Sequence, residues 1–145
     1  MREISATEVF KLKECLSELA EHHNRVSMNF KGNYPKEAFA QTLERFAADL
    51  EAGESHIAVI ENGDRVIGFC KVNCSHGVGT LEYMVVLNSQ RGKGHGARLM
   101  KWAMDKLREA GVAFVEVKVV DGNEAIRFYE KYGFKMNAHL LRLRS

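Results

Sequence analysis

Two stretches in the N-terminal third of the chain place apolar side chains at the spacing of a helix. In the first, they recur at steps of three and four, at Val9, Leu12, Leu16 and Leu19. Ser5 and Glu8 form a capping box before this stripe, which predicts an amphipathic helix. The second stripe is formed by Phe39, Leu43, Phe46 and Leu50. Pro35 suits the first residue of a helix and Gly53 suits its end, so a second helix is predicted between them.

Short apolar segments bounded by turn residues follow, and they are typical of strands. Residues 56–61 (HIAVIE) and 66–72 (VIGFCKV) flank the turn residues 62–64 (NGD), which predicts a hairpin. Residues 81–86 (LEYMVV) come after a break with two glycines and form a further strand segment. We therefore expect three antiparallel strands.

Helical spacing returns after Gly94 and then gives way to a strand. The apolar positions of this helix are Leu99, Met100, Ala103, Leu107 and Ala110. Gly111 suits the position after its end. Residues 114–120 (FVEVKVV) are rich in valine and predict the next strand.

The C-terminal part predicts one more helix and one more strand. Asp121 or Asn123 suits the cap of a helix that ends at Gly133, and residues 134–143 (FKMNAHLLRL) predict a final strand. The chain contains no internal repeat or low-complexity tract and only one proline. We therefore expect residues 1–145 to form one domain of mixed α/β class.

The composition narrows the class of protein. The 145 residues with 46% hydrophobic content suit one packed core. The net charge of +2 gives no reason to expect a nucleic acid or a membrane as partner. No apolar stretch reaches the roughly 18 residues of a membrane span, and the start lacks the apolar core of a signal peptide. The three cysteines and six histidines lack metal-ligand spacing, so we expect reduced thiols, no metal and a cytoplasmic location.

Three glycines alternate with other residues where the last of the three strands leads into the following helix, in the segment RGKGHG at 91–96. Such a junction exposes backbone N–H groups at the positive end of the helix, and glycines let an anion approach the backbone. Arg91, Lys93 and Arg98 add positive charge. The segment is a candidate phosphate-binding loop. An ordinary turn that needs glycine for positive φ is the alternative.

Two known phosphate-binding motifs can be compared with this segment. The chain has no GxxxxGK[ST] motif, which excludes a Walker loop. Gly92, Gly94 and Ala97 satisfy the G-x-G-x-x-G/A pattern of dinucleotide-binding folds. That pattern belongs to a sheet of βαβ units, whereas the strands before it are predicted as an antiparallel meander. The dinucleotide interpretation is therefore disfavoured.

The same loop is similar to the R/Q-x-x-G-x-G/A signature of the GNAT acyl-CoA-dependent N-acetyltransferases. Residues 81–86 lie where that family has its signature strand, and residues 123–134 (NEAIRFYEKYGF) resemble its C-terminal helix and the following Gly-Phe. The resemblance implies an α/β (α+β) GNAT fold. This fold has a mixed, mostly antiparallel, twisted sheet of six or seven strands, flanked by about four helices, with the fourth and fifth strands splayed apart.

The resemblance also implies acetyl-CoA as co-substrate, with pantetheine in the splay and the pyrophosphate on the glycine loop. The residues assigned to coenzyme binding in this way are Met84, Val85, Val86, Arg91, Gly92, Lys93, Gly94, His95, Gly96, Ala97 and Asn123. A backbone N–H near Val86 is implied as the oxyanion donor. Asn123 precedes Tyr129 by six residues, where seven is the commoner spacing in the family. A role for Asn123 as helix cap alone therefore stays open.

Acetyl transfer to an amine requires a base for the amine and a proton for the leaving thiolate. Glu82 is the candidate base, in the position of an acidic residue of the family, and a salt-bridged strand carboxylate is the alternative. Tyr129 matches the tyrosine that protonates the thiolate, and an aromatic core residue is the alternative. A covalent route through Cys70 or Cys74 is a minor mechanism.

These observations predict an N-acetyltransferase that moves acetyl from acetyl-CoA to a primary amine by direct attack in a ternary complex, without metal. The acceptor is expected to be a small molecule, selected by the first two helices, the loop at 24–34 and the last strands. A protein lysine or N-terminus as acceptor, and a non-catalytic acyl-CoA-binding module, stay open as alternatives. A homodimer through a sheet edge or the last strand is also open.

Overall fold

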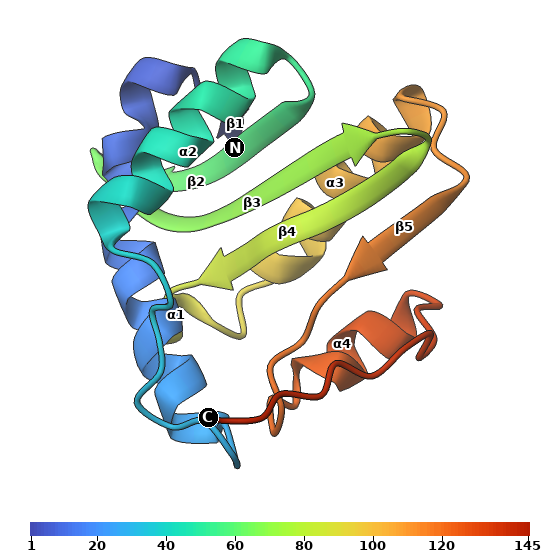
Figure 1. Ribbon diagram of the computed structural model, residues 1–145. Coiled ribbons are helices and arrows are strands. Elements are labelled where there is room, and N and C mark those ends of the chain that lie inside the picture. The colour runs from blue at the N-terminus through green and yellow to red at the C-terminus, as the bar shows by residue number, and fades with distance from the viewer.

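A sheet of five strands crosses the molecule (Figure 1). The structure, a computed structural model, describes residues 1–145. In chain order the strands are β1 (Arg2–Glu3), β2 (Ser55–Asn62), β3 (Arg65–Ser75), β4 (Val78–Val86) and β5 (Phe114–Val117). Neighbours in the sheet follow the chain order, with β1 to β4 antiparallel and β5 parallel to β4. The predicted mixed, mostly antiparallel α/β class is confirmed.

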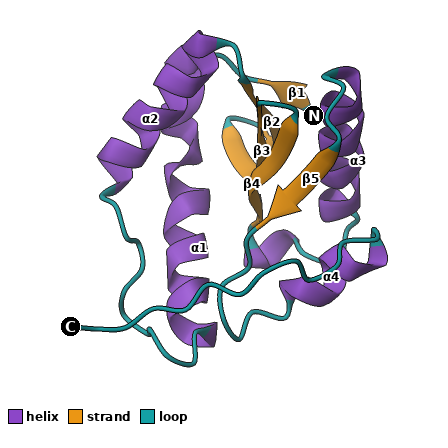
Figure 2. Cartoon of the chain, turned by 45° about the vertical axis from the view of Figure 1, so that its right-hand side comes forward, coloured by secondary structure: helices purple, strands orange, loops and turns teal.

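Helices cover both faces of this sheet. They are the 3₁₀ helix η1 (Ala6–Leu12), α1 (Lys13–Val26), α2 (Phe39–Ala52), the 3₁₀ turn η2 (Asn88–Gln90), α3 (His95–Glu109) and α4 (Ala125–Lys131). Helices α1 and α2 lie on one face and α3 on the other, and α4 follows β5 near the end of the sheet (Figure 2). No helix combines the length and the apolar character needed to span a bilayer.

The predicted apolar stripes form the core on both faces of the sheet. Leu12 and Leu16 from the first stripe and Phe46 from the second are buried. The Phe46 ring packs edge-on against Phe69 of β3, with centroids 6.3 Å apart. On the opposite face, the buried residues of α3 are Leu99, Met100, Ala103 and Leu107. Removing these side chains from water holds the helices on the sheet.

Gly79 shows why a glycine precedes the apolar segment at 81–86. It lies inside β4, and a Cβ at this position would come within 2.7 Å of Cδ2 of Leu107. Glycine therefore allows α3 to pack directly on β4. The turn between β3 and β4 is made by His76 and Gly77, which both have positive φ.

Strands β4 and β5 separate after a short parallel pairing, which ends where Leu81 lies opposite Val117. Strand β4 continues to Val86 without a neighbour on this edge. The strand predicted over residues 114–120 is shorter than expected, because the residues after 117 have no strand to pair with. The splay that the resemblance implies is therefore present.

The predicted final strand at 134–143 is absent, so the sheet has five strands and not six or seven. The apolar residues that suggested it are exposed: Leu140, Leu141 and Leu143. Alternation predicts a strand, but a strand also needs a partner edge, and this tail lies away from β5. The guanidinium groups of Arg142 and Arg144 instead lie over the ring of Phe30.

The second helix begins at Phe39 and not at Pro35. The Tyr34–Pro35 peptide bond is cis. The side chain of Asn24 accepts from the N–H groups of Gly32 and Tyr34 and donates to the Tyr34 carbonyl. These hydrogen bonds hold the end of the α1–α2 loop in a non-helical conformation, and the helix starts after it.

Candidate active site

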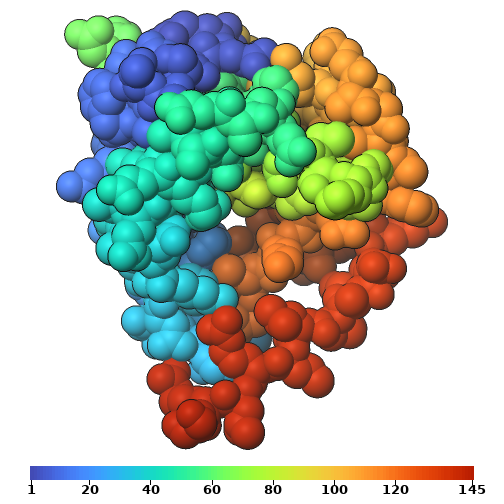
Figure 3. Space-filling view, turned by 45° about the horizontal axis from the view of Figure 1, so that its top comes forward, coloured from blue at the N-terminus to red at the C-terminus, as the bar shows by residue number.

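A cavity of about 1240 Å³ lies where β4 and β5 separate. Helices α1 and α2, strand β4, the start of α3, the segment after β5 and α4 form its wall. The surface is hollowed between the α1–α2 loop, the segment after β5 and the C-terminal tail (Figure 3). Most residues predicted for the site line this cavity: Glu82, Met84, Val86, Arg91, Gly92, Gly94, His95, Gly96, Ala97, Asn123 and Tyr129.

Two residues predicted for coenzyme binding have side chains that do not line the cavity, Val85 and Lys93. Val85 lies in the hydrophobic core, between Met84 and Val86, because side chains alternate along a strand. The Lys93 ammonium donates to Oε1 of Gln90 at 3.2 Å. Any contact of Val85 with a ligand would therefore involve its backbone.

The start of α3 leaves a row of backbone donors free. The N–H groups from Gly92 to Ala97 have no hydrogen-bond acceptor in the protein, and the first helical bond runs from Arg98 N to Gly94 O at 3.2 Å. Gly92 and Gly94 have φ values of 78° and 82°, and no atom lies within 4 Å of a Cβ built on either. Free N–H groups at a helix N-terminus attract anions. This junction therefore fits a phosphate or diphosphate.

Two side chains complete this end of the cavity. Nδ1 of His95 is buried and has no hydrogen-bond partner. An unpaired buried nitrogen is costly, and it indicates a site for a polar ligand group. Nε of Arg91 donates to the Val86 carbonyl at 3.5 Å, which places its positive charge between β4 and the glycine loop.

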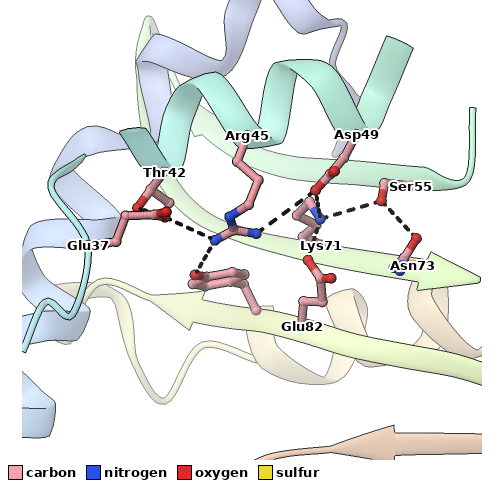
Figure 4. A network of polar contacts seen from close by, with 9 residues as sticks. Glu37, Thr42, Arg45, Asp49, Ser55, Lys71, Asn73 and Glu82 are labelled. Carbon is pink, nitrogen blue, oxygen red and sulfur yellow. Dashed lines mark hydrogen bonds and ion pairs between the residues drawn. The ribbon is translucent and has the colours of Figure 1, made fainter. Parts of the chain in front are cut away.

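Glu82 belongs to a network of ion pairs around a buried lysine (Figure 4). Its carboxylate contacts Nζ of Lys71, whose side chain is fully buried. The same ammonium donates to Oδ2 of Asp49 at 2.9 Å and to Oγ of Ser55 at 3.4 Å. A lysine is almost never fully buried unless its charge is paired, as here. Glu82 is thus a salt-bridged carboxylate that also lines the cavity.

Arg45 of α2 extends this network toward the α1–α2 loop. Its guanidinium donates to Oε1 of Glu37 at 3.4 Å and to the hydroxyl of Tyr83 at 3.3 Å. Oγ1 of Thr42 donates to the same Glu37 oxygen at 2.8 Å. These contacts join the loop before α2 to the cavity face of β4.

The sequence alone does not predict this network, because its members lie far apart along the chain. Lys71 is 22 residues from Asp49 and 11 residues from Glu82. The one available signal is that Lys71 is the only charged residue of the apolar segment 66–72. A charge in such a segment needs a buried partner.

Tyr129 lies in the cavity wall with its ring almost entirely buried. The ring packs edge-on against Phe128 and Phe134, with centroids 5.5 Å and 5.8 Å away. Burial, together with the nearby Cys70, raises the pKa of Tyr129 to about 12. Its hydroxyl is therefore protonated at neutral pH and able to donate a proton.

Asn123 contacts the start of α4, whose N-cap residue is Glu124, and also meets α1. Its Oδ1 accepts from the Ala125 N–H at 3.0 Å and lies 3.4 Å from Nε2 of His22. Its side chain thus accepts from the first N–H of α4 without occupying the N-cap position, and the residue also lines the cavity. His22 and His23 line the cavity as well. Burial, with the charges of His22 and Lys36, lowers the pKa of His23 to about 4, so this imidazole is neutral at pH 7.

No cysteine lines the cavity. Cys15 and Cys70 are fully buried, and burial raises the pKa of both thiols. Since the thiolate is the nucleophilic form of cysteine, this arrangement disfavours a covalent route through Cys70.

Known proteins resemble this chain in both sequence and structure. A sequence profile of the acetyltransferase (GNAT) domain matches residues 53–136. The aminoalkylphosphonate N-acetyltransferase of Salmonella typhimurium is 27% identical over 99 residues, which cover 63% of this chain and 64% of that protein. The matched region thus spans less than two thirds of the length of this relative.

Two solved structures have the same fold. The PaiA N-acetyltransferase of Thermoplasma acidophilum, in complex with coenzyme A, aligns with a TM-score of 0.78 at 16% identity over 94% of this chain and 89% of that one. The glucosamine-6-phosphate N-acetyltransferase of Arabidopsis thaliana aligns with a TM-score of 0.70 at 21% identity over 99% of this chain and 95% of that one. The family profile covers more than half of the sequence. The chain therefore belongs to the GNAT acetyltransferase family.

Proposed function

We propose that the protein is an N-acetyltransferase that uses acetyl-CoA to acetylate the primary amine of a small molecule, by direct attack in a ternary complex. One observation carries the proposal: the glycine loop, Glu82 and Tyr129 all face one cavity at the splay of β4 and β5. Acetyl transfer to an amine requires N–H donors that bind an anion, a carboxylate that accepts a proton and a protonated hydroxyl that donates one. Membership of the GNAT family supports the same activity.

The residues present fit acetyl-CoA. The free N–H groups from Gly92 to Ala97 would hold its diphosphate, with Arg91 adding charge and His95 offering its unpaired nitrogen. The edge of β4 from 82 to 86 has no strand neighbour on this side and would pair with the extended pantetheine arm. When bound, acetyl-CoA supplies the acetyl group as an activated thioester.

Glu82 and Tyr129 would move the two protons of the reaction. An aliphatic amine with a pKa of about 10.4 is almost entirely protonated at pH 7, so a base must accept its proton. The Glu82 carboxylate, fixed by Lys71 at the cavity wall, would do so directly or through water. Tyr129, with a pKa of about 12, stays protonated and would give its proton to the leaving thiolate.

A small amine is the acceptor that the observations support best. The cavity of about 1240 Å³ exceeds the roughly 300–1,000 Å³ typical of a single small-molecule site, which leaves room for a coenzyme arm and an amine together. The relatives named for aminoalkylphosphonate and for glucosamine-6-phosphate are named for small molecules that carry an amine.

The test is turnover of acetyl-CoA with a library of primary amines. Release of the coenzyme thiol and the mass of the product are measured together. We expect at least one small amine to gain an acetyl group. Binding of acetyl-CoA without any acetylated product, from small amines or from peptides, would contradict the proposal and support a non-catalytic acyl-CoA-binding module.

A further inference from the structure

Three of the four Lys and Arg side chains that line the cavity form no ion pair in the protein. The four residues are Lys36, Arg45, Arg91 and Lys118. Arg45 and the buried Lys71 account for every ion pair at the cavity wall. Arg91 lies on the glycine loop, beside the free N–H groups. Lys36 and Lys118 remain without a carboxylate partner.

None of the carboxylates around this part of the cavity forms an ion pair with Lys36 or Lys118. Glu37, the neighbour of Lys36, is held by two side chains of α2. Asp121 accepts hydrogen bonds from the residues that follow α1. Glu82 is held by the buried ammonium of β3, and Glu124, at the start of α4, forms no ion pair. No carboxylate therefore pairs with either lysine, and the ammonium of Lys36 lies only over the ring of Tyr34, 5.5 Å from its centroid.

A third cation comes close to them from another segment. Lys36 lies on the α1–α2 loop, Lys118 directly after β5, and Arg142 on the C-terminal tail. These three segments surround the hollow in the space-filling view. Burial and the like charges of Arg142 and Lys118 lower the pKa of Lys36, so both cations lie close enough to repel its ammonium. A bound anion relieves such repulsion.

We propose that Lys36, Lys118 and Arg142 form an anion site for the acceptor, so that the substrate is a small amine that also carries a phosphate, phosphonate or carboxylate. This inference rests on the acetyltransferase function proposed above. The anion would lie between the α1–α2 loop, the segment after β5 and the tail, while the amine faces Glu82. A diamine would place a second positive charge beside the lysines and is disfavoured by repulsion.

A phosphate group of the coenzyme is an alternative anion for Lys36, Lys118 and Arg142. The free N–H groups at 92–97 already provide a place for the diphosphate, and they lie at the start of α3. Lys36 lies on the loop that leads into α2 and next to Glu37, which contacts α2. The test below therefore follows the KM of acetyl-CoA and the KM of the acceptor in the same variants.

The test compares phosphoethanolamine, ethanolamine and ethylenediamine as acceptors for the full chain at saturating acetyl-CoA. We expect kcat/KM to be highest for phosphoethanolamine and lowest for ethylenediamine. Lys36→Ala and Lys118→Ala should each raise the KM for phosphoethanolamine by about tenfold, the usual size of a lost hydrogen bond between charged groups. The KM for ethanolamine should change far less. Lys31→Ala is the matched control, because Lys31 is exposed on the same loop and does not line the cavity.

The outcomes separate this inference from the proposed function. Better turnover of ethanolamine or ethylenediamine would overturn the anion site and leave the acetyltransferase intact. A raised KM for acetyl-CoA in the two variants, absent with dephospho-acetyl-CoA, would assign the lysines to the coenzyme and overturn the inference. An equal rise of the KM for phosphoethanolamine in Lys31→Ala would show a general electrostatic attraction by positive charge and would overturn the specific anion site.

If no amine turns over, calorimetric binding of phosphoethanolamine to the CoA-loaded protein decides the question. Binding that is lost in the Lys36→Ala/Lys118→Ala double variant supports the anion site. Absence of binding to the unmodified chain overturns it.

Discussion

Tyr129 combines a buried ring with a hydroxyl that stays protonated at the cavity wall. Tyr129→Phe removes the hydroxyl and keeps the ring that packs against Phe134. We expect kcat to fall by about 10² to 10⁴ fold, because the thiolate would leave without a proton donor. Steady-state kinetics measure this fall, and calorimetry should show nearly unchanged affinity for acetyl-CoA. Tyr132→Phe, near the end of the same helix, is the control, and a normal kcat in Tyr129→Phe would remove Tyr129 from the mechanism.

Lys71 holds two carboxylates together in the interior. Lys71→Met would remove the ammonium that Glu82 and Asp49 share, and only Arg45, 3.9 Å from Asp49, would remain as a counter-charge. We expect the free energy of unfolding to fall by about 3 kcal/mol, at the low end for a broken buried pair because the carboxylates keep 23% and 34% of their side-chain surface exposed. Urea denaturation measures the loss. Lys71→Met/Glu82→Gln should lose less than the sum of its single variants, and strict additivity would show that the pair is not coupled.

At the scale of elements, the start of α3 carries the proposed coenzyme site. Gly94→Glu would place a carboxylate beside the free N–H groups, so we expect affinity for acetyl-CoA to fall by about a hundredfold or more. Isothermal titration measures this change. Gly94→Ala controls for positive φ, which costs an ordinary residue about 1 kcal/mol. Gly111→Ala carries the same strain after the other end of α3, where φ is 72°, and should leave binding intact. Undiminished binding by Gly94→Glu would refute this location of the diphosphate.

Elements that depend on local pattern follow from the sequence, and those that depend on distant partners do not. The apolar stripe of α3 buries Leu99 and Leu107 as its spacing predicts. The tail at 134–143 has an equally regular alternation, yet it forms no strand because pairing requires an edge elsewhere in the fold.

The same distinction holds within the candidate site. Motif spacing identified the glycine loop and Tyr129, which line the cavity. The contact of Lys71 with Asp49 joins β3 to α2 and depends on how the helix crosses the sheet. Lys36 and Lys118 likewise meet only because the α1–α2 loop and the segment after β5 border one cavity. Spacing along the chain carries no information about such contacts.

Across the whole molecule, the cavity wall combines a region that matches the family profile with a region outside that match. The family profile covers residues 53–136, which include the glycine loop and Tyr129. Helix α1, the following loop and α2 lie outside the matched region and contribute His23, Lys36 and Arg45 to the wall. The proposed coenzyme site is therefore built from the part shared with the family. The proposed acceptor side is built largely from the part outside it, and differences in acceptor between relatives should map there.

Acetyl-CoA should stabilise the whole chain, because its proposed site exists only when β4, α3 and α4 are assembled around the cavity. A ligand at a hundredfold excess over its Kd, bound only by the folded state, adds about 2.7 kcal/mol. For a chain of this size that corresponds to a rise in Tm of about 5–10 °C. Differential scanning fluorimetry with acetyl-CoA and with NAD at equal concentration compares the two ligands.

We expect no shift with NAD. Gly92, Gly94 and Ala97 match the dinucleotide pattern, but β1 to β4 pair antiparallel. The single βαβ unit, β4–α3–β5, leaves no second mononucleotide-binding half. Gly94→Glu should lose the shift with acetyl-CoA while its unliganded Tm stays close to that of Gly94→Ala, because both variants carry the same backbone strain. An NAD shift as large as that of acetyl-CoA would overturn the coenzyme assignment, since a site built for pantetheine along the free edge of β4 offers nothing to a second nucleoside.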